Sequence, residues 1–475
     1  MQNIITKKTN YKNKKLGVII FLLKHKKIIV PILFILSFAL FYFIVDHSSQ
    51  SLVAHDEGLY ARRSRLVEES SNWFSPPFLL PHHKTIGSYW FIALSIKIFG
   101  KSELALRLPS ILSSFICLFI SYFISLIVSN KNSALISVFS LSSMPLWIQY
   151  SRYASPDIPF VLCILLVILF FLKFIETKIY KNKYFYIFIA GIFISIAFFI
   201  RSYMVFIPLV GLTPFFVYHL LKTNNYFRSI FFTGILIGSI PTLINLYFSY
   251  QKFGSQGITS LFVFARKQVI EGVFFDNLFI TPLNFIYFTF PTGILFITLL
   301  ILTTSRYKIK YALLMYFYPL ISLFILLCMS TSYPHYYLFL LPSLSMLFAI
   351  KLDFYSYRFS LSKNIIKYLF ICLIILIVIT VIAFTFYFGK YIIINFNEIS
   401  NIKYIISSFF FFTFLLSLRY ILDTKGTQFN LTKFFYNLII PQYISLSLLF
   451  NFGIIGNPNP KIKAFLNDNL ISSIV

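Results

Sequence analysis

Residues 157–176 read DIPFVLCILLVILFFLKFIE, and this stretch decides the fold class. An aspartate opens it, and apolar residues then continue almost without a break. An α-helix needs about 20 such residues to cross a bilayer. Because backbone N–H and C=O groups find no partners in lipid, a chain that crosses it must bond them within a helix. We therefore predict that residues 158–176 form a transmembrane helix.

Runs of the same kind recur along the whole chain, which is 58% hydrophobic and only 12% charged. That composition excludes a water-soluble domain, and the sequence lacks the short alternating strands of a transmembrane barrel. The prediction is an all-α polytopic membrane protein with about thirteen spans. The predicted spans lie near residues 28–45, 107–128, 133–149, 158–176, 184–200, 203–221, 229–249, 281–302, 311–330, 336–351, 366–388, 403–420 and 434–455.

Orientation follows from the basic residues, which short loops carry mainly on the cytoplasmic side. A lysine-rich arm precedes the first span, so we expect a cytoplasmic N-terminus. No small-residue cleavage site follows that span, which favours a retained anchor. The predicted division is a basic arm at 1–27, a transmembrane domain at 28–455 with long extracytoplasmic loops at 46–106 and 250–280, and a short extracytoplasmic tail at 456–475. In the first loop, residues 58–74 and 87–100 suit short interfacial helices.

The formal net charge is +27, from 41 Lys and Arg against 14 Asp and Glu. These charges are scattered over short loops, so we interpret them as anchors to anionic headgroups and expect no nucleic-acid partner. The first extracytoplasmic loop is the exception, because its basic residues stand on the side where short loops usually carry few. A phosphate ligand would explain them.

Asp56 and Glu57 stand side by side where the first long loop leaves the membrane. One reading is structural: Asp56 caps a helix that begins near Gly58, and Glu57 complements the dipole of that helix. The other reading is chemical: a carboxylate at the membrane border acts as a general base on an acceptor hydroxyl. The pair alone leaves both readings open.

Further charged residues are expected on the same face. Asp157 opens a span and Arg152 precedes it by five residues, although a plain helix start would explain Asp157 as well. Lys84, Arg201 and His335 add cations, and a cation near a span end often only reaches for the headgroups. Gathered on one face, they could instead stabilise a leaving phosphate whose charge grows in the transition state.

Cofactor signatures are weak. The histidines at 55, 82, 83 and 335 match no strong metal spacing, so we predict no cofactor, and a divalent metal is not predicted. The four cysteines lie far apart in apolar runs and indicate neither a disulfide framework nor a metal site. No phosphate-binding loop, dinucleotide fingerprint or nucleophile elbow occurs. A donor carried by lipid is therefore favoured over a soluble nucleotide.

These residues resemble the motifs of GT-C membrane glycosyltransferases of the protein O-mannosyltransferase and lipid A aminoarabinose transferase type. Asp56, Glu57 and Tyr60 match the Asp-Glu pair and nearby tyrosine of the first external loop. The later motifs correspond to NWFSPP at 72–77, KTIGSYW at 84–90, FGKSELALRLPS at 99–110, YSRYASPD at 150–157 and SYPHYYLFLLP at 332–342. Two departures stand out: the prolines that usually follow Lys84 are missing, and Arg201 replaces a lysine, which changes the geometry of a phosphate contact.

The resemblance implies a GT-C fold and transfer of one sugar from a polyprenyl-phosphate carrier, of the undecaprenyl type, to an extracytoplasmic acceptor. That acceptor could be lipid A, a protein or another glycan. Asp56 would be the catalytic base, and Glu57 would orient the acceptor or the cationic partners. The donor phosphate would be held by Lys84, Arg201 and His335, and the sugar or acceptor would be positioned by Tyr60, Arg152, Asp157 and Tyr336.

Two other readings stay open. A flippase or transporter of lipid-linked sugars would also use cations and aromatic residues at headgroup depth. It would be expected to show broken helices or polar groups in mid-membrane, whereas the spans here are nearly free of charge. A glycan ligase would concentrate its essential residues in a late external loop, whereas here the charge is concentrated in the first.

Overall fold

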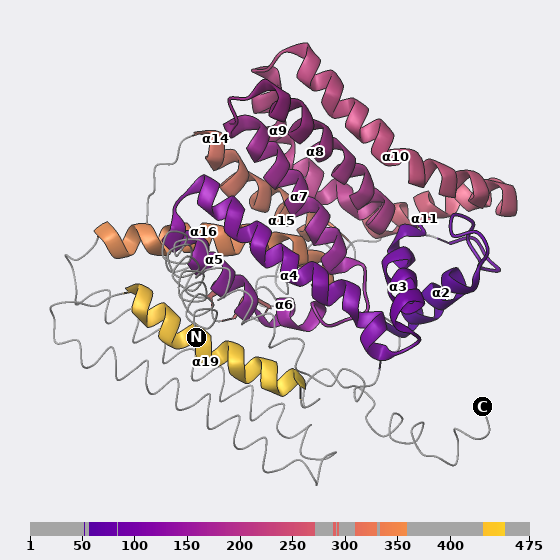
Figure 1. The fold of residues 1–475 in the computed structure, drawn as a ribbon, viewed down its shortest axis with the longest axis horizontal. Coiled ribbons are helices and arrows are strands. Elements are labelled where there is room, and N and C mark those ends of the chain that lie inside the picture. Colours follow the sequence, from indigo (N-terminus) through magenta and orange to yellow (C-terminus); the bar gives the residue numbers. More distant parts are fainter. Residues whose placement is uncertain are drawn as a thin grey trace, which may run out of the picture. The chain divides into compact units, whose positions relative to one another are not determined.

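The computed structural model describes residues 52, 57–82, 84–270, 288–290, 292–293, 309–329, 333–358 and 431–451. Every regular element within these ranges is helical (Figure 1). The elements are α2 (Glu57–Glu69), α3 (Gly87–Phe99), α4 (Glu103–Val128), α5 (Lys131–Ser143), α6 (Pro145–Tyr150), α7 (Asp157–Glu176), α8 (Tyr180–Arg201), η1 (Ser202–Val205), α9 (Phe206–Leu221), α10 (Asn225–Phe253), α11 (Gln256–Ile270), α14 (Ile309–Ala312), η2 (Leu313–Phe317), α15 (Tyr318–Leu327), η3 (Pro334–Leu340), α16 (Leu341–Arg358) and α19 (Leu431–Asn451).

Within the described ranges, five helical stretches are long and apolar enough to cross a membrane. They are Glu103–Val128, Asp157–Glu176, Tyr180–Leu221, Asn225–Phe253 and Pro334–Phe354. Each coincides with one or two of the predicted spans, so a multi-pass helical membrane protein is confirmed. The predicted spans at 28–45, 366–388 and 403–420, with most of 281–302, lie outside the described residues, and the total of about thirteen stays a prediction.

One predicted span is divided in the structure. Residues 133–149 were expected to form a single helix, but α5 ends at Ser143 and α6 begins at Pro145. Proline has no backbone N–H and its ring clashes with the preceding helical turn, so it starts a helix more readily than it continues one. The residue between the two helices, Met144, is accordingly extended, with a ψ of 127°.

The chain reverses direction between α8 and α9. Ser202 follows Arg201 with a backbone φ of 52°, which lies in the positive region that residues other than glycine rarely adopt. The ring of Phe185, near the start of α8, and the ring of Phe216, near the end of α9, both pack against the C-terminal half of α7. The two helices therefore run antiparallel, as the separate spans at 184–200 and 203–221 predicted.

Helix α8 packs against α7 on one side and α10 on the other. The contact with α10 is close because both helices place a glycine there. A Cβ on Gly191 would strike the carbonyl oxygen of Phe231, and a Cβ on Gly234 would strike that of Phe188. Small residues of this kind let helix backbones approach each other in lipid, where van der Waals packing is a main source of attraction.

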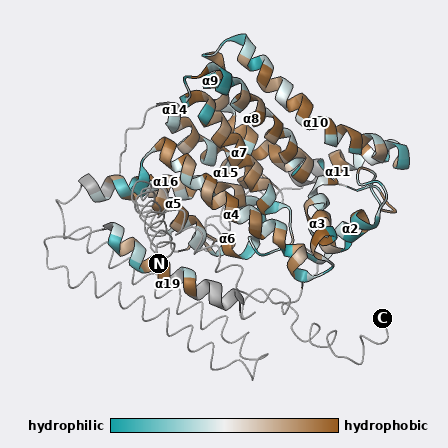
Figure 2. Ribbon diagram, in the orientation of Figure 1, coloured by the Kyte–Doolittle hydropathy of each residue, from teal (hydrophilic) through white to brown (hydrophobic). Residues whose placement is uncertain are grey.

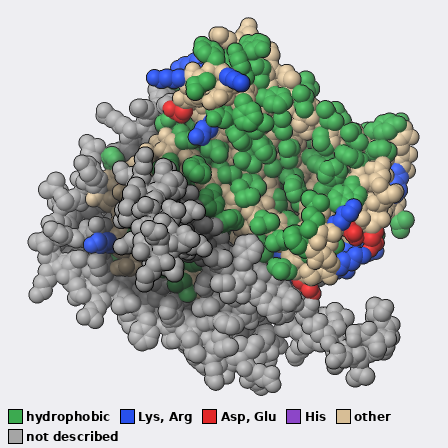
Figure 3. All heavy atoms as spheres, in the orientation of Figure 1, with side chains coloured by type: hydrophobic (Ala, Val, Ile, Leu, Met, Phe, Trp, Pro, Cys, Tyr) green, Lys and Arg blue, Asp and Glu red, His purple; other side chains and the backbone are tan. Residues whose placement is uncertain are grey.

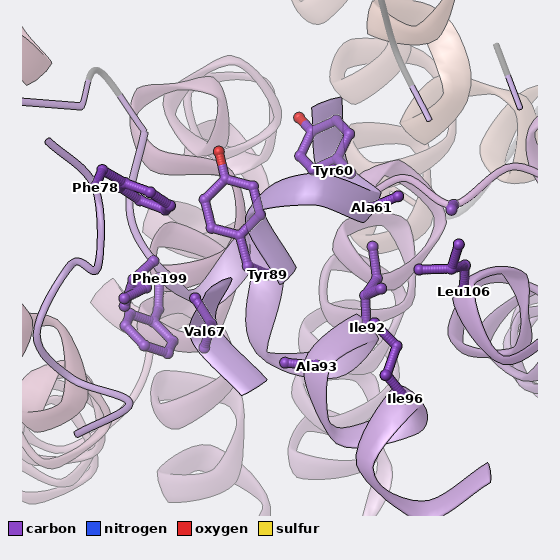
Figure 4. Close-up of a cluster of buried hydrophobic side chains, with 12 residues drawn as sticks. Tyr60, Ala61, Val67, Phe78, Tyr89, Ile92, Ala93, Ile96, Leu106 and Phe199 are labelled. Atoms are coloured by element: carbon purple, nitrogen blue, oxygen red, sulfur yellow. The ribbon is translucent and has the colours of Figure 1, made fainter. Parts of the chain in front are cut away.

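The first predicted extracytoplasmic loop contains the two expected short helices, α2 and α3. They pack against each other, and α3 also contacts α4 and α8. A buried apolar cluster joins these parts (Figure 4). It contains Tyr60, Ala61, Val67, Phe78, Ile86, Tyr89, Ile92, Ala93, Ile96, Leu106, Ala154 and Phe199. Fully burying one isoleucine contributes about 1.5–3 kcal/mol, so this cluster holds the loop firmly against the ends of the long helices.

The long helices and the first loop differ in the polarity of their residues. Hydrophobic residues dominate the long helices from α4 to α10, whereas hydrophilic residues gather at helix ends and on α2 (Figure 2). On the face drawn in Figure 3, apolar side chains cover the middle of the described region and the charged ones sit towards its edges. Exposed apolar side chains on α10, including Leu236, Ile240 and Leu243, fit contact with lipid.

Candidate active site

A small, partly enclosed pocket lies beside the apolar cluster of the first loop. Five of the residues that line it were predicted from the sequence as site residues: Tyr60, Lys84, Asp157, Arg201 and His335. The remaining lining residues are Leu59, Tyr150 and Ser155. These residues come from α2, the loop before α3, the end of α6, the α6–α7 loop, the start of α7, the end of α8, and η3.

Helix geometry explains why Asp157 and Arg201 meet. Asp157 is the first residue of α7 and Arg201 the last of α8, and the connection between these antiparallel helices is short. The start of one helix therefore lies beside the end of the other. Arg201 forms an ion pair with Asp157 through a guanidinium N–H and Oδ1, and the two side chains are 9% and 7% exposed.

Lys84 supplies the second cation of the pocket. Its Nζ donates a hydrogen bond of 2.8 Å to the hydroxyl of Tyr60 and lies 4.9 Å from the centre of that ring. No carboxylate among the described residues forms an ion pair with it. Burial, and secondarily the nearby charge of Arg201, lowers the pKa of Lys84 below its ordinary value of 10.5. Among the described residues that line the pocket there are thus two cations, Lys84 and Arg201, and one anion, Asp157.

Aromatic rings form another wall. The ring of His335 stacks on Tyr333 with centroids 5.7 Å apart, and it packs edge-on against Tyr336 at 4.5 Å and near Tyr150 at 5.9 Å. Tyr336 is buried and does not itself line the pocket, but it interacts electrostatically with Arg201. The predicted late tyrosine-rich segment is thereby brought to the same place as the first loop.

Glu57 lies away from the pocket lining and is fully buried. Its two carboxylate oxygens accept hydrogen bonds from Arg107, at 2.9 Å from Nε and 3.0 Å from a terminal nitrogen. Oε1 also accepts the backbone N–H of Ala154 at 2.9 Å. Glu57 therefore ties the start of α2 to the start of α4 and to the α6–α7 loop. The sequence did not indicate this pairing with Arg107, and the expected role of Glu57 in orienting the acceptor or the phosphate-binding cations stays a prediction.

Two other residues weighed in the sequence, Arg152 and His82, are not among the residues that line the pocket. Arg152 is buried in the α6–α7 loop. His82 uses Nε2 in contacts with Arg63 and with the Tyr89 hydroxyl, the latter at 2.8 Å. Asp56, the predicted base, lies outside the described residues, although Glu57 beside it opens α2.

The described residues contain no cluster of side chains that could hold a metal ion. Within the parts of the chain that the structure describes, no three His, Cys, Asp or Glu side chains gather as ligands would. The positions at 55, 56 and 83 are not among them. Independence from metal stays a prediction.

Sequence reasoning missed Ser155, Tyr150 and the role of Arg107. Arg107 and Ser155 were present in the quoted motifs, but only as letters that matched. The signal that could have singled out Arg107 is its position: a charged residue four places into a long apolar helix needs a buried partner. Nothing local distinguishes Ser155 from the many serines of this chain.

The fold and the pocket define a helical membrane protein with a buried pocket lined by two cations, Lys84 and Arg201. Residues 83–248 match the family described as dolichyl-phosphate-mannose-protein mannosyltransferase. This segment contains Lys84, Asp157 and Arg201, and it confirms the resemblance found in the sequence.

Individual relatives give a narrower comparison than the family does. The chain is similar to undecaprenyl phosphate-alpha-4-amino-4-deoxy-L-arabinose arabinosyl transferases: 26% identical to that of Yersinia enterocolitica over 211 residues, 43% of this chain and 38% of the relative. It is 30% identical to that of Pseudomonas paraeruginosa over 95 residues, 20% and 17% of the two lengths. An uncharacterised Aquifex aeolicus protein is 30% identical over 126 residues, 26% and 25%. The chain thus matches a quarter or less of the length of the latter two relatives.

The fold extends further than the sequence match. The crystal structure of ArnT from Cupriavidus metallidurans bound to undecaprenyl phosphate superposes with a TM-score of 0.70 at 14% identity, covering 91% of this chain and 78% of that one. The apo structure of the same protein gives 0.69 at 17% identity, with 90% and 78% covered. The predicted GT-C fold is confirmed.

Proposed function

We propose that this chain is a membrane glycosyltransferase that moves one sugar from a polyprenyl-phosphate carrier to an acceptor. The observation that carries the proposal is the pocket, where Lys84, Arg201, Asp157 and Tyr60 meet from segments far apart in the sequence. The ArnT structure of the same fold contains undecaprenyl phosphate, and the relatives are named for undecaprenyl-phosphate-linked aminoarabinose, which supports a donor of this class.

Charge matching supports a phosphate ligand. A sugar phosphodiester carries about one negative charge, and among the described residues that line the pocket the two cations Lys84 and Arg201 outnumber the one anion, Asp157. When the sugar leaves, the phosphate becomes a monoester and its charge moves towards −2. Cations fixed beside it stabilise that transition state more than the bound donor, and this difference is what lowers the barrier.

The reaction is a displacement at the anomeric carbon. A hydroxyl oxygen of the acceptor attacks that carbon, its bond to the phosphate oxygen breaks, and the lipid phosphate departs with the bonding electrons. Asp56 takes the proton of the attacking hydroxyl. Attack from the face opposite the phosphate inverts the anomeric centre.

The other residues have supporting roles. Glu57, bonded to Arg107 and Ala154, fixes the start of α2 and with it the position of the neighbouring Asp56. Asp157 orients Arg201, and Tyr60 orients Lys84. His335 completes the phosphate site, and Tyr336 and Arg152 support the pocket wall around it.

The acceptor we propose is lipid A, with the sugar of the aminoarabinose class, following the names of the relatives and the motif resemblance. The pocket would open to the extracytoplasmic face and the N-terminus would lie in the cytoplasm, as the distribution of basic residues predicts. Neither the flippase nor the ligase reading gains support from the comparisons.

The test uses membranes from cells that express the wild type or Asp56→Asn, incubated with a panel of radiolabelled undecaprenyl-phosphate sugars that includes the aminoarabinose donor. The wild type should transfer label into the lipid A fraction. Asp56→Asn should bind the donor and lose transfer by orders of magnitude. Wild-type membranes that bind the donor and transfer nothing would overturn the proposal in favour of a flippase.

A further inference from the structure

Ser155 lines the pocket from the α6–α7 loop, two residues before Asp157. It is 2% exposed, so bulk water does not solvate its side chain. The residue before it, Ala154, belongs to the apolar cluster of the first loop. Ser155 is therefore a buried polar residue placed between a packed core and a charged pocket.

The backbone around Ser155 is held on both sides. Its N–H donates to the carbonyl of Tyr153 at 2.8 Å, and its carbonyl accepts the hydroxyl of Ser110 at 3.0 Å. The preceding N–H, that of Ala154, donates to Glu57 at 2.9 Å. The side chain is thus presented from a fixed backbone, which is the arrangement that lowers the entropy cost of binding a ligand.

The hydroxyl itself is unsatisfied. Its Oγ makes no hydrogen bond within the described residues. Ser151, in the same loop and equally buried, instead donates to the carbonyl of Ile148 at 2.9 Å. Several buried serines share the condition of Ser155, but it is the one of them that lines this pocket. Burying an unbonded hydroxyl costs free energy, so its persistence at a ligand site calls for a partner that arrives with the ligand.

We infer that the Ser155 hydroxyl donates a hydrogen bond to a non-bridging phosphate oxygen of the lipid donor. The inference rests on the proposed function and adds to it a neutral donor that acts beside Lys84 and Arg201. A phosphate is the fitting partner because Lys84 and Arg201 line the same pocket, and hydrogen bonds to an ionised acceptor are about twice as strong as neutral ones. Ser155 thus contributes affinity for the phosphate group itself, independent of which sugar it carries.

The test compares purified wild type, Ser155→Ala and Ser151→Ala in detergent. Binding of undecaprenyl phosphate, its sugar-bearing form and undecaprenol, which has no phosphate, is measured by titration. Ser155→Ala should bind both phosphate-bearing lipids about tenfold more weakly and undecaprenol unchanged, because a hydrogen bond to a charged group is lost. Ser151→Ala should bind like the wild type.

The unfolding temperature without ligand shows whether a loss of affinity comes from a lost hydrogen bond or from disturbed packing. Replacing an unsatisfied hydroxyl removes a cost in the free protein, so Ser155→Ala should not lower the unfolding temperature without ligand. If it does, Ser155→Thr, which keeps the hydroxyl, decides: recovered affinity supports the inference, and affinity that stays low overturns it.

The remaining outcomes are distinguishable. Wild-type affinity of Ser155→Ala for undecaprenyl phosphate would overturn the inference and leave the proposed function standing. A loss confined to the sugar-bearing lipid would also overturn it, since the hydroxyl would then contact the sugar. A wild type that binds neither phosphate-bearing lipid would overturn both the inference and the proposed function.

Discussion

Two buried acid–arginine pairs, Glu57 with Arg107 and Asp157 with Arg201, lie close together in the chain's fold and differ in what surrounds them. The first pair makes two hydrogen bonds, adds the N–H of Ala154, and lies away from the pocket lining. The second pair stands in the pocket wall beside Lys84. A pair whose bonding capacity is filled by protein holds segments together, whereas charges that face a pocket are available to a ligand.

The largest effect on stability should come from breaking the filled pair. Glu57→Gln removes the charge of the carboxylate that pairs with buried Arg107, and removing one partner of a buried ion pair costs about 3–5 kcal/mol. The unfolding temperature of the purified protein should fall accordingly, with transfer lost in parallel. Glu69→Gln is the matched control, because Glu69 is an exposed acid on the same helix. Normal unfolding together with lost transfer would contradict this reading and make Glu57 a catalytic group.

A substitution in the pocket should instead lower donor affinity and leave the unfolding temperature nearly unchanged. Lys84→Ala removes a cation from the proposed phosphate site, and a charge-assisted hydrogen bond contributes about 1.5–3 kcal/mol. Donor affinity should therefore fall by about 10- to 100-fold, while the unfolding temperature stays near that of the wild type because Lys84 is desolvated without an acidic partner among the described residues. Titration with undecaprenyl phosphate checks this. A large loss of stability with unchanged affinity would reverse the comparison.

The pH dependence of donor binding should be a smaller effect with a defined sign. Burial and Arg201 lower the pKa of Lys84 below 10.5, so its positive charge is lost as pH rises through a value lower than that of a free lysine. Donor affinity should weaken on the alkaline side before pH 10.5 is reached. In Lys84→Arg the guanidinium stays charged, and this decline should disappear. An identical alkaline decline in both proteins would assign it to another group.

The smallest effect is expected at the exposed pair of Glu69 and Lys101. Their side chains are 54% and 52% exposed, and solvent screens such contacts. Lys101→Ala should leave donor affinity and unfolding temperature unchanged at physiological salt. A measurable loss of affinity would show that cations outside the pocket also attract the donor.

Much of this arrangement was predictable from the sequence, because long apolar runs fix the helices and helix ends fix what meets there. Asp157 and Arg201 were expected on one face since each stands at the end of a span. Lys84 and His335 were expected with them because the predicted topology puts their segments on the same face, and the resemblance implied the same. The division at Pro145 was missed, although the proline itself was visible.

The contacts that Glu57 makes inside the protein were harder to predict. Glu57 contacts Arg107 across 50 residues and Ala154 across 97, and no local pattern specifies contacts of that range. A bidentate pair requires both backbones to be placed by the packing of α2, α3 and α4, which no single segment encodes. Ser155 becomes notable only when its hydroxyl is seen to lack a partner within the described residues.

The most direct test of the central claim is an experimental structure of this protein with undecaprenyl phosphate bound. The account predicts the phosphate within hydrogen-bond distance of Lys84 and Arg201, with Glu57 still bonded to Arg107. A phosphate bound elsewhere, with Lys84 and Arg201 untouched, would contradict the assignment of this pocket as the donor site.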